Sequence, residues 1–209
     1  MKGKINYMLL SEIRSKDVFK KLCKVESTGE GNLLHLTETE TAAAQIKVLK
    51  YFFIKYNPTV FLETGTNQGN FLYLTQEIIK KPIIAYTFDI NSGSKEAVSI
   101  LQEEYPLSSF FFIEGDTKNT LSDFFVRGID FAWIDGDHNP DGLKSDLYNC
   151  DRLRIPVVAV DDIKFFSTYY KDYKLDEIVK KFCDLCGYVV ENNPYWEEDS
   201  RGIVILKRI

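Results

Sequence analysis

The chain has 209 residues, of which 44% are hydrophobic, and a formal net charge of −5. This length suits one domain with a large core. The negative charge argues against a nucleic-acid partner, because a surface that binds nucleic acid normally carries a basic stripe. Near the start of the chain, the apolar patch at residues 8–10 is too short for a signal peptide or a membrane span, so we expect no membrane span.

Four cysteines, at positions 23, 150, 183 and 186, have no paired metal-ligand spacing. Cys183 and Cys186 form a C-x-x-C pair, but they lie late in a predicted helix, whereas a redox pair needs a helix N-terminus to stabilise its thiolate. We therefore expect ordinary packing for this pair and a cytoplasmic protein with reduced thiols.

The first predicted element is a helical N-terminal extension over residues 1–36, which ends in a glycine-rich break. The main domain is predicted at 37–209 and opens with a helix from Thr37 that Asn57-Pro58 stops. Five strands should follow, each with a helical stretch after it, at 59–63, 83–88, 109–113, 129–134 and 156–160.

The last two strands are expected at 187–191 and 202–207. Only a polar loop joins them, without room for a helix, so this pair should be antiparallel. The pattern as a whole predicts an α/β fold, a doubly wound seven-stranded and mostly parallel sheet that ends in an antiparallel hairpin.

Two clusters of acids close neighbouring apolar runs in the second half of the chain. Asp135 and Asp137 follow the run 129–134, and Asp161-Asp162 follows the run 155–160. Parallel neighbours end on the same edge of a sheet, about 4.8 Å apart, and open α/β sheets bind ligands at that edge. Crowded like charges cost free energy unless a cation or a proton shares the site, so we predict a divalent metal site.

The first predicted strand ends in the turn Glu63-Thr64-Gly65-Thr66-Asn67-Gln68-Gly69, where glycine allows a sharp bend and close approach to a ligand. Asp89 follows 20 residues after Gly69, where an acid can accept hydrogen bonds from both ribose hydroxyls. A dinucleotide motif would need glycine at 67 and 70, which are both asparagine, and no phosphate-cradling loop is present. Ribose binding without pyrophosphate binding is the chemistry of S-adenosylmethionine.

These motifs resemble the class I S-adenosylmethionine-dependent methyltransferases in order and spacing, over roughly residues 40–209. The sequence carries the glycine turn, then Asp89, Glu114-Gly115-Asp116, Asp135-Gly136-Asp137-His138 and Asp161-Asp162. The last two motifs resemble the metal-dependent sugar O-methyltransferases of the macrocin and novobiocin tailoring type. Catechol-type enzymes are similar as well, although they usually carry asparagine where this chain has Asp162.

The resemblance implies a cofactor site for S-adenosylmethionine. Glu63, Gly65 and Gly69 would hold the methionine end of the cofactor. Asp89 would bind the ribose and Asp116 the adenine amino group, although Asp116 could instead only cap the following helix. The whole implied set is Glu63, Thr64, Gly65, Thr66, Gly69, Asp89, Gly115, Asp116 and Asp135.

The resemblance also implies that Asp135, Asp161 and Asp162 bind Mg²⁺, or another divalent ion such as Mn²⁺. Asp137 is then expected to be the general base, with His138 as the competing candidate. These residues could instead have only structural roles: Asp137 could cap a helix beside an exposed His138, and Asp161-Asp162 could simply begin a loop.

The expected function is Mg²⁺-dependent methyl transfer to a sugar or glycan hydroxyl. Aromatic side chains in the stretches 164–173 and 192–198 favour a sugar acceptor, because sugar C–H faces stack on aromatic rings. Two alternatives stay open: a catechol-like small-molecule O-methyltransferase, and a non-catalytic nucleoside-binding module of a glycan assembly complex. A homo-oligomer is also left open.

Overall fold

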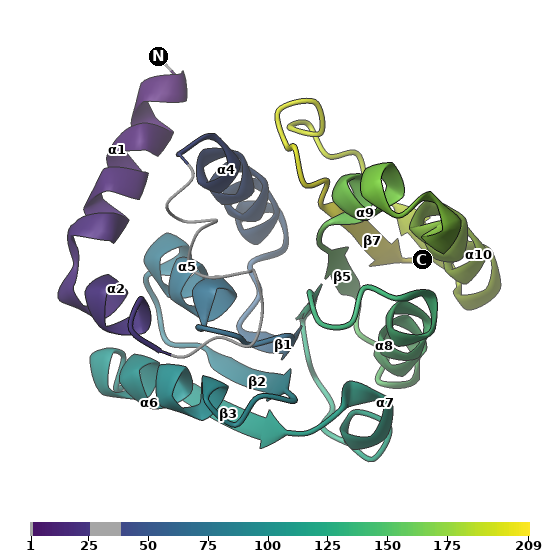
Figure 1. Cartoon of the computed structure of the whole chain (residues 1–209), viewed down its shortest axis with the longest axis horizontal. Coiled ribbons are helices and arrows are strands. Elements are labelled where there is room, and N and C mark those ends of the chain that lie inside the picture. Colours follow the sequence, from purple (N-terminus) through teal and green to yellow (C-terminus); the bar gives the residue numbers. More distant parts are fainter. Residues whose placement is uncertain (1, 26–38) are drawn as a thin grey trace.

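The computed structural model of the chain describes residues 2–25 and 39–209 (Figure 1). Within these residues, seven strands form one sheet in the order β3-β2-β1-β4-β5-β7-β6. The pairs among β1 to β5 are parallel, whereas β7 pairs antiparallel with both β5 and β6. The strands are β1 (Val60–Thr64), β2 (Ile84–Asp89), β3 (Ser109–Glu114), β4 (Phe131–Ile134), β5 (Val157–Val160), β6 (Tyr188–Val190) and β7 (Val204–Arg208).

This sheet confirms the predicted fold class, including the antiparallel end. The apolar runs of β4 and β5 are buried along their whole length, as expected of parallel strands that helices cover on both faces. The register pairs Thr64 with Ile134 and Ile134 with Val160. The residues that follow β1, β4 and β5 therefore begin at the same level of the sheet edge.

Helices cover both faces of the sheet (Figure 1). Phe61, Phe131 and Trp133 point to one face, where they share a core with α1 (Lys2–Ser15), α2 (Asp17–Leu22) and α4–α6. Leu62 and Ala132, one position away, point to the other face and pack with α8–α10 and with Leu121, which follows α7. The helices named here are α4 (Thr39–Tyr56), α5 (Asn70–Ile79), α6 (Ser94–Glu104), α7 (Thr117–Thr120), α8 (Pro140–Arg152), α9 (Ile163–Tyr169) and α10 (Leu175–Cys186).

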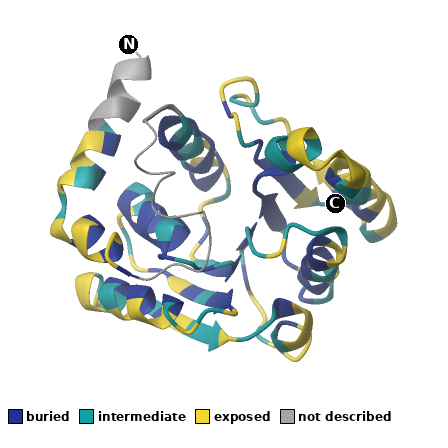
Figure 2. Ribbon diagram, viewed as in Figure 1, coloured by how far each residue is buried: buried dark blue, intermediate teal, exposed yellow. Residues whose placement is uncertain are grey.

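The N-terminal helices α1 (Lys2–Ser15) and α2 (Asp17–Leu22) pack on the domain. Figure 2 shows buried positions on the side of these helices that faces α5 and α6. Tyr73 of α5 donates a hydrogen bond of 2.8 Å to the carbonyl of Ile13, and Lys16 pairs with the buried Glu77 at 2.6 Å. The predicted boundary at 36–37 and the helix start at Thr37 lie outside the described residues, so the domain division stays a prediction.

Two further expectations concern membranes and thiols. Of the helices described for this chain, none is long and apolar enough to cross a membrane. Cys23, Cys150, Cys183 and Cys186 are all unpaired. Cys150 of α8 is part of the core, and Cys183 and Cys186 of α10 pack against it.

Asp146 of α8 is a buried carboxyl group that contacts no solvent. Burial, reinforced by the charges of Asp137 and Asp116, raises the pKa of Asp146 from its ordinary value of 3.8 to about 6. Between these two pH values the folded state keeps a proton that the unfolded state loses. The stability gained from this proton is therefore complete below about pH 4 and is lost as pH rises through 6.

We predict that Asp146→Asn, which cannot ionise, raises the free energy of unfolding at pH 7 by up to about 3 kcal/mol and has little effect at pH 4. Urea unfolding of both proteins across this pH range measures the difference. Asp172→Asn, at an exposed carboxylate, is the control and should follow the wild type. A constant difference between Asp146→Asn and wild type at all pH values would contradict the ionisation argument.

Candidate functional site

A hollow of about 700 Å³ lies at the carboxyl ends of the parallel strands. Ten of the residues predicted to form the site line it: Glu63, Gly65, Thr66, Asp89, Gly115, Asp116, Asp135, Asp137, His138 and Asp162. Thr64, Gly69 and Asp161 do not line it. A larger hollow, of about 1280 Å³, lies among α10, β6 and the loop after β6, but it contains none of the predicted site residues, so size does not identify the site.

The glycine turn packs directly on the acidic end of β4. Gly65 has a φ of +84°, and a Cβ atom there would lie 2.1 Å from the carbonyl oxygen of Asp135. Only glycine fits such a position. At the end of the turn Gly69, with a φ of +75°, is the N-cap residue just before α5. The close contact holds the glycine turn and Asp135 at a fixed separation.

Asp89 ties the glycine turn to the end of β2. One carboxylate oxygen accepts the backbone N–H of Asn67 at 2.6 Å, and the other accepts that of Asn91 at 2.8 Å. The side chain is thus fixed at the wall of the hollow, and each oxygen keeps a further acceptor position. This arrangement suits a pair of ribose hydroxyls.

Glu63 lies at the end of β1 and is almost fully buried. Burial raises the pKa of its carboxyl group well above the usual value, although the hydroxyl of Thr87 donates a hydrogen bond to it. The same Thr87 hydroxyl contacts the hydroxyl of Thr66. A cationic ammonium group in the hollow would favour the ionised form of Glu63.

Asp116 caps α7, because its side chain accepts the N–H of Lys118 at 2.9 Å. The alternative role as a helix cap is therefore observed, and the residue also lines the hollow. The neighbouring Gly115 has a φ of +136° and donates its N–H to the carbonyl of Asp89 at 2.8 Å. The proposed contact of Asp116 with adenine stays a prediction.

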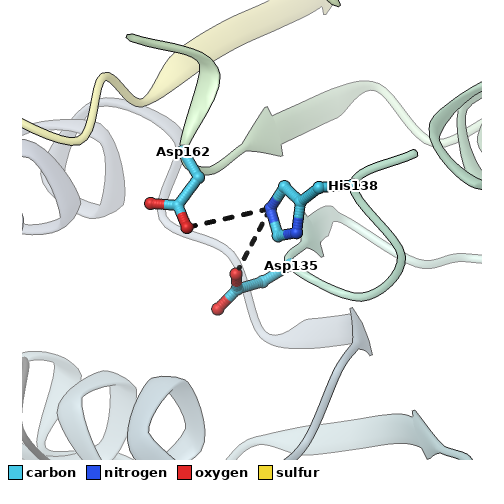
Figure 3. A group of neighbouring side chains, drawn as sticks. All are labelled: Asp135, His138 and Asp162. Atoms are coloured by element: carbon cyan, nitrogen blue, oxygen red, sulfur yellow. Dashed lines mark ion pairs between the residues drawn. The ribbon is translucent and has the colours of Figure 1, made fainter. Parts of the chain in front are cut away.

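Asp135, His138 and Asp162 form a compact cluster (Figure 3). The Nε2 atom of His138 lies 3.6 Å from an oxygen of Asp135 and 4.0 Å from an oxygen of Asp162. The three candidate ligand atoms lie within 4.8 Å of one another. The His138 ring stacks on Phe166, with centroids 4.5 Å apart and planes at 5°, which fixes the direction of Nε2.

The charges in this cluster favour a cation or a proton. Burial, and then the neighbouring carboxylate of Asp162, raise the pKa of Asp135 well above its usual value. Burial lowers the pKa of His138, so its ring is neutral near pH 7. The buried Nε2 atom has no hydrogen-bond partner among the described residues. The donors therefore fit a divalent ion held by one or two carboxylates, which leaves positions for water and acceptor oxygens.

Asp161 does not line the hollow, and its role as a metal ligand stays a prediction. Its buried carboxylate accepts a hydrogen bond from Gln45 of α4 at 3.2 Å and the N–H of Asp162 at 2.9 Å. Asp162 has a φ of +63° just before α9, and it lines the hollow whereas Asp161 does not. The structure thus places His138, and not Asp161, beside Asp135 and Asp162.

Asp137, the favoured base in the sequence analysis, lies at the rim instead of in the cluster. It pairs with Lys118 at 2.9 Å and accepts the N–H of Asn139 at 3.0 Å. Partial burial acts to raise the pKa of Asp137, but the hydrogen bonds and charge of Lys118, together with Asn139, lower it. A paired carboxylate of low pKa is a weak base, so the geometry favours His138.

Arg201, between β6 and β7, is a residue of the site that the sequence analysis missed. Its guanidinium group binds both oxygens of Asp162 and lies 4.8 Å from the ring centroid of Phe165. No motif spacing marks this arginine, because only the return of β7 beside β5 brings it to Asp162.

The aromatic side chains divide between two places. Phe165, Phe166 and Tyr170 line the hollow. Tyr195 packs on Tyr51, and Trp196 covers Lys164 with 4.3 Å between Nζ and a ring centroid. The stretch 164–173 therefore contributes to the site, whereas these two aromatic rings of the loop 192–198 do not line it.

A known protein family covers the part of the chain that carries these residues. Residues 62–163 match the model of the family described as a methyltransferase domain. This segment runs from β1 to the first residue of α9 and includes the glycine turn, Asp89 and the acidic cluster. No curated protein matches the sequence.

Several solved structures share the fold. The S-adenosylhomocysteine-bound methyltransferase PaMTH1 of Podospora anserina has a TM-score of 0.65 and 14% identity, covering 95% of this chain and 93% of that one. An O-methyltransferase from Bacillus cereus, also bound to S-adenosylhomocysteine, has a TM-score of 0.56 and 15% identity, covering 96% and 91%. Magnesium protoporphyrin IX methyltransferase from Synechocystis has a TM-score of 0.58 and 10% identity, covering 98% and 100%.

Three observations bear on the class of this protein. They are the seven-stranded sheet with its antiparallel end, the hollow at the carboxyl edge and the family match. They support the expected class, the class I S-adenosylmethionine-dependent methyltransferases: residues 62–163 match a methyltransferase domain, and the chain shares the fold of solved methyltransferases. The expected enzyme class, a methyltransferase, is thereby confirmed, and the fold shared with structures bound to S-adenosylhomocysteine supports S-adenosylmethionine as the cofactor.

We predict that Asp89→Ala weakens S-adenosylmethionine binding by about 2–4 kcal/mol, because two hydrogen bonds to a charged acceptor are lost. Isothermal titration calorimetry measures this change. Asp130→Ala is a matched control: Asp130 also accepts backbone N–H groups, from Thr59 at 2.8 Å and Val60 at 3.0 Å, but it lies outside the hollow. Equal affinities for both variants would remove Asp89 from the cofactor site.

Proposed function

We propose that the protein transfers a methyl group from S-adenosylmethionine to a hydroxyl group of a sugar or glycan, with the help of Mg²⁺ or Mn²⁺. The observation that carries this proposal is the cluster of Asp135, His138 and Asp162, which opens into the same hollow as the glycine turn and Asp89. A methyl donor and an acceptor oxygen could therefore meet beside a cation site. The name of the Bacillus cereus neighbour, an O-methyltransferase, supports oxygen as the acceptor atom.

The residues of the hollow divide between the two substrates. Glu63 and Gly65 would hold the methionine end of the cofactor, and Asp89 would hold the ribose. Asp135 and Asp162 would bind the cation. A bound divalent ion would make an acceptor hydroxyl more acidic.

His138 is the residue we assign as general base. Its neutral ring is fixed by the stack on Phe166, and its unpartnered Nε2 atom faces the space between the two carboxylates. It can accept the hydroxyl proton there as the oxygen attacks the methyl group. Asp137 would then serve to hold Lys118 and the start of α8.

The acceptor would lie against Phe165, Phe166 and Tyr170, which form an aromatic wall of the hollow. Such a wall suits the C–H face of a sugar ring, but a planar catechol ring would also stack on it. Both kinds of acceptor can present neighbouring hydroxyl groups to a cation, so the catechol-like alternative stays open. The proposed location is the cytoplasm, where the four unpaired cysteines would stay reduced.

Methyl transfer from labelled S-adenosylmethionine to free sugars and to catechols tests this function. We expect transfer to a sugar that stops in excess chelator and returns when Mg²⁺ or Mn²⁺ is added. Transfer to catechols but not to sugars would show that the acceptor is a catechol and not a sugar. Cofactor binding without transfer to any acceptor would favour the non-catalytic nucleoside-binding module, and full activity in chelator would exclude a role for the metal.

Substitution of the two candidate bases separates their roles. We expect His138→Asn to lower turnover by roughly 10²–10⁴-fold, the usual effect of losing a general base. Asp137→Asn should cost much less, because the structure already pairs that carboxylate with Lys118. Neither variant should change S-adenosylmethionine affinity in calorimetry. The assignment is reversed if Asp137→Asn is the more damaging change.

A further inference from the structure

Arg201 holds the same oxygen that the cation site needs. Its Nη2 atom contacts Oδ2 of Asp162, and this Oδ2 is the atom that lies 4.0 Å from Nε2 of His138. The second guanidinium contact, from Nε, takes the other oxygen of Asp162. Both carboxylate oxygens of one proposed metal ligand are thus bound by an arginine.

The backbone of Arg201 is fixed independently of this ion pair. The buried carboxylate of Asp199 accepts the N–H groups of Arg201, Gly202 and Ile203 at 3.2, 3.0 and 2.6 Å. The carbonyl of Arg201 in turn accepts the N–H of Lys164 at 3.0 Å. The side chain can therefore leave Asp162 by rotation of its own bonds, without movement of the loop.

The charge around Arg201 is strongly negative. Asp135, Asp161 and Asp162 lie together at the ends of β4 and β5. Among the described residues, Arg201 is the one Lys or Arg side chain that lines the hollow. The guanidinium group consequently supplies the counter-charge that a divalent ion would otherwise supply.

We infer that Arg201 is a resident counter-ion that competes with the divalent cation for Asp162. This inference rests on the proposed divalent site. An arginine and a divalent ion on the same carboxylate repel each other, so binding of the ion requires Arg201 to release Oδ2 of Asp162. The arginine then lowers the apparent affinity for the cation and keeps Asp162 compensated in its absence.

Mn²⁺ binding to the full-length protein tests the competition without any measurement of activity. The electron paramagnetic resonance signal of free Mn²⁺ reports the bound fraction in the absence of cofactor and acceptor. We expect Arg201→Gln to bind Mn²⁺ about tenfold more tightly than wild type, because a competing cation has been removed. Arg208→Gln, which removes the Arg208–Asp151 ion pair at the far edge of β7, is the matched control and should bind as wild type does.

Arg201→Lys keeps the charge but not the two-pronged geometry, and it serves where Arg201→Gln does not fold. We expect its affinity for Mn²⁺ to lie between those of wild type and Arg201→Gln. Equal or weaker Mn²⁺ binding by the Arg201 variants, with binding retained in wild type, would overturn the competition and leave the divalent site in place. Failure of both wild type and variants to bind Mn²⁺ would overturn the divalent site itself.

Discussion

Like charges crowd the carboxyl edge of the sheet, because β4 and β5 are adjacent parallel strands and an aspartate directly follows each of them. The backbone spacing of about 4.8 Å between such strands places Asp135 and Asp161 close together. Burial, together with neighbouring carboxylates, raises the pKa of both groups. Two contacts offset part of this charge: Gln45 donates a hydrogen bond to Asp161, and Arg201 forms an ion pair with Asp162. The polar contacts of this part of the site therefore compensate the negative charge of the aspartates.

The cofactor side of the hollow depends on the same edge. Gly65 lies so close to the backbone of Asp135 that no side chain fits between them. Asp89 then fixes the turn from the other side through the N–H of Asn67. The turn proposed to hold the methyl donor and the aspartate proposed to hold the cation are therefore linked by direct backbone contact, which would help a reaction that depends on alignment of two substrates.

The sequence predicts the strands to within a few residues, because buried parallel strands are continuous apolar runs and the acids mark where they end. It also predicts which edge carries the site. It does not predict which of Asp161 and Asp162 faces the hollow, since that depends on one positive φ at Asp162. Nor does it reveal Arg201 or the Lys118–Asp137 pair, because these contacts join segments 39 and 19 residues apart through the tertiary fold.

The central claim is that one hollow holds both the methyl donor and a cation. A crystal structure of the protein grown with S-adenosylhomocysteine and Mn²⁺, with anomalous scattering to locate the metal, tests this most directly. The account predicts ribose hydroxyls on Asp89 and an anomalous peak on Asp135 and Asp162, with the guanidinium of Arg201 moved away from Asp162. A nucleoside bound elsewhere, or Arg201 still paired with Asp162 and no metal peak beside Asp135, would contradict it.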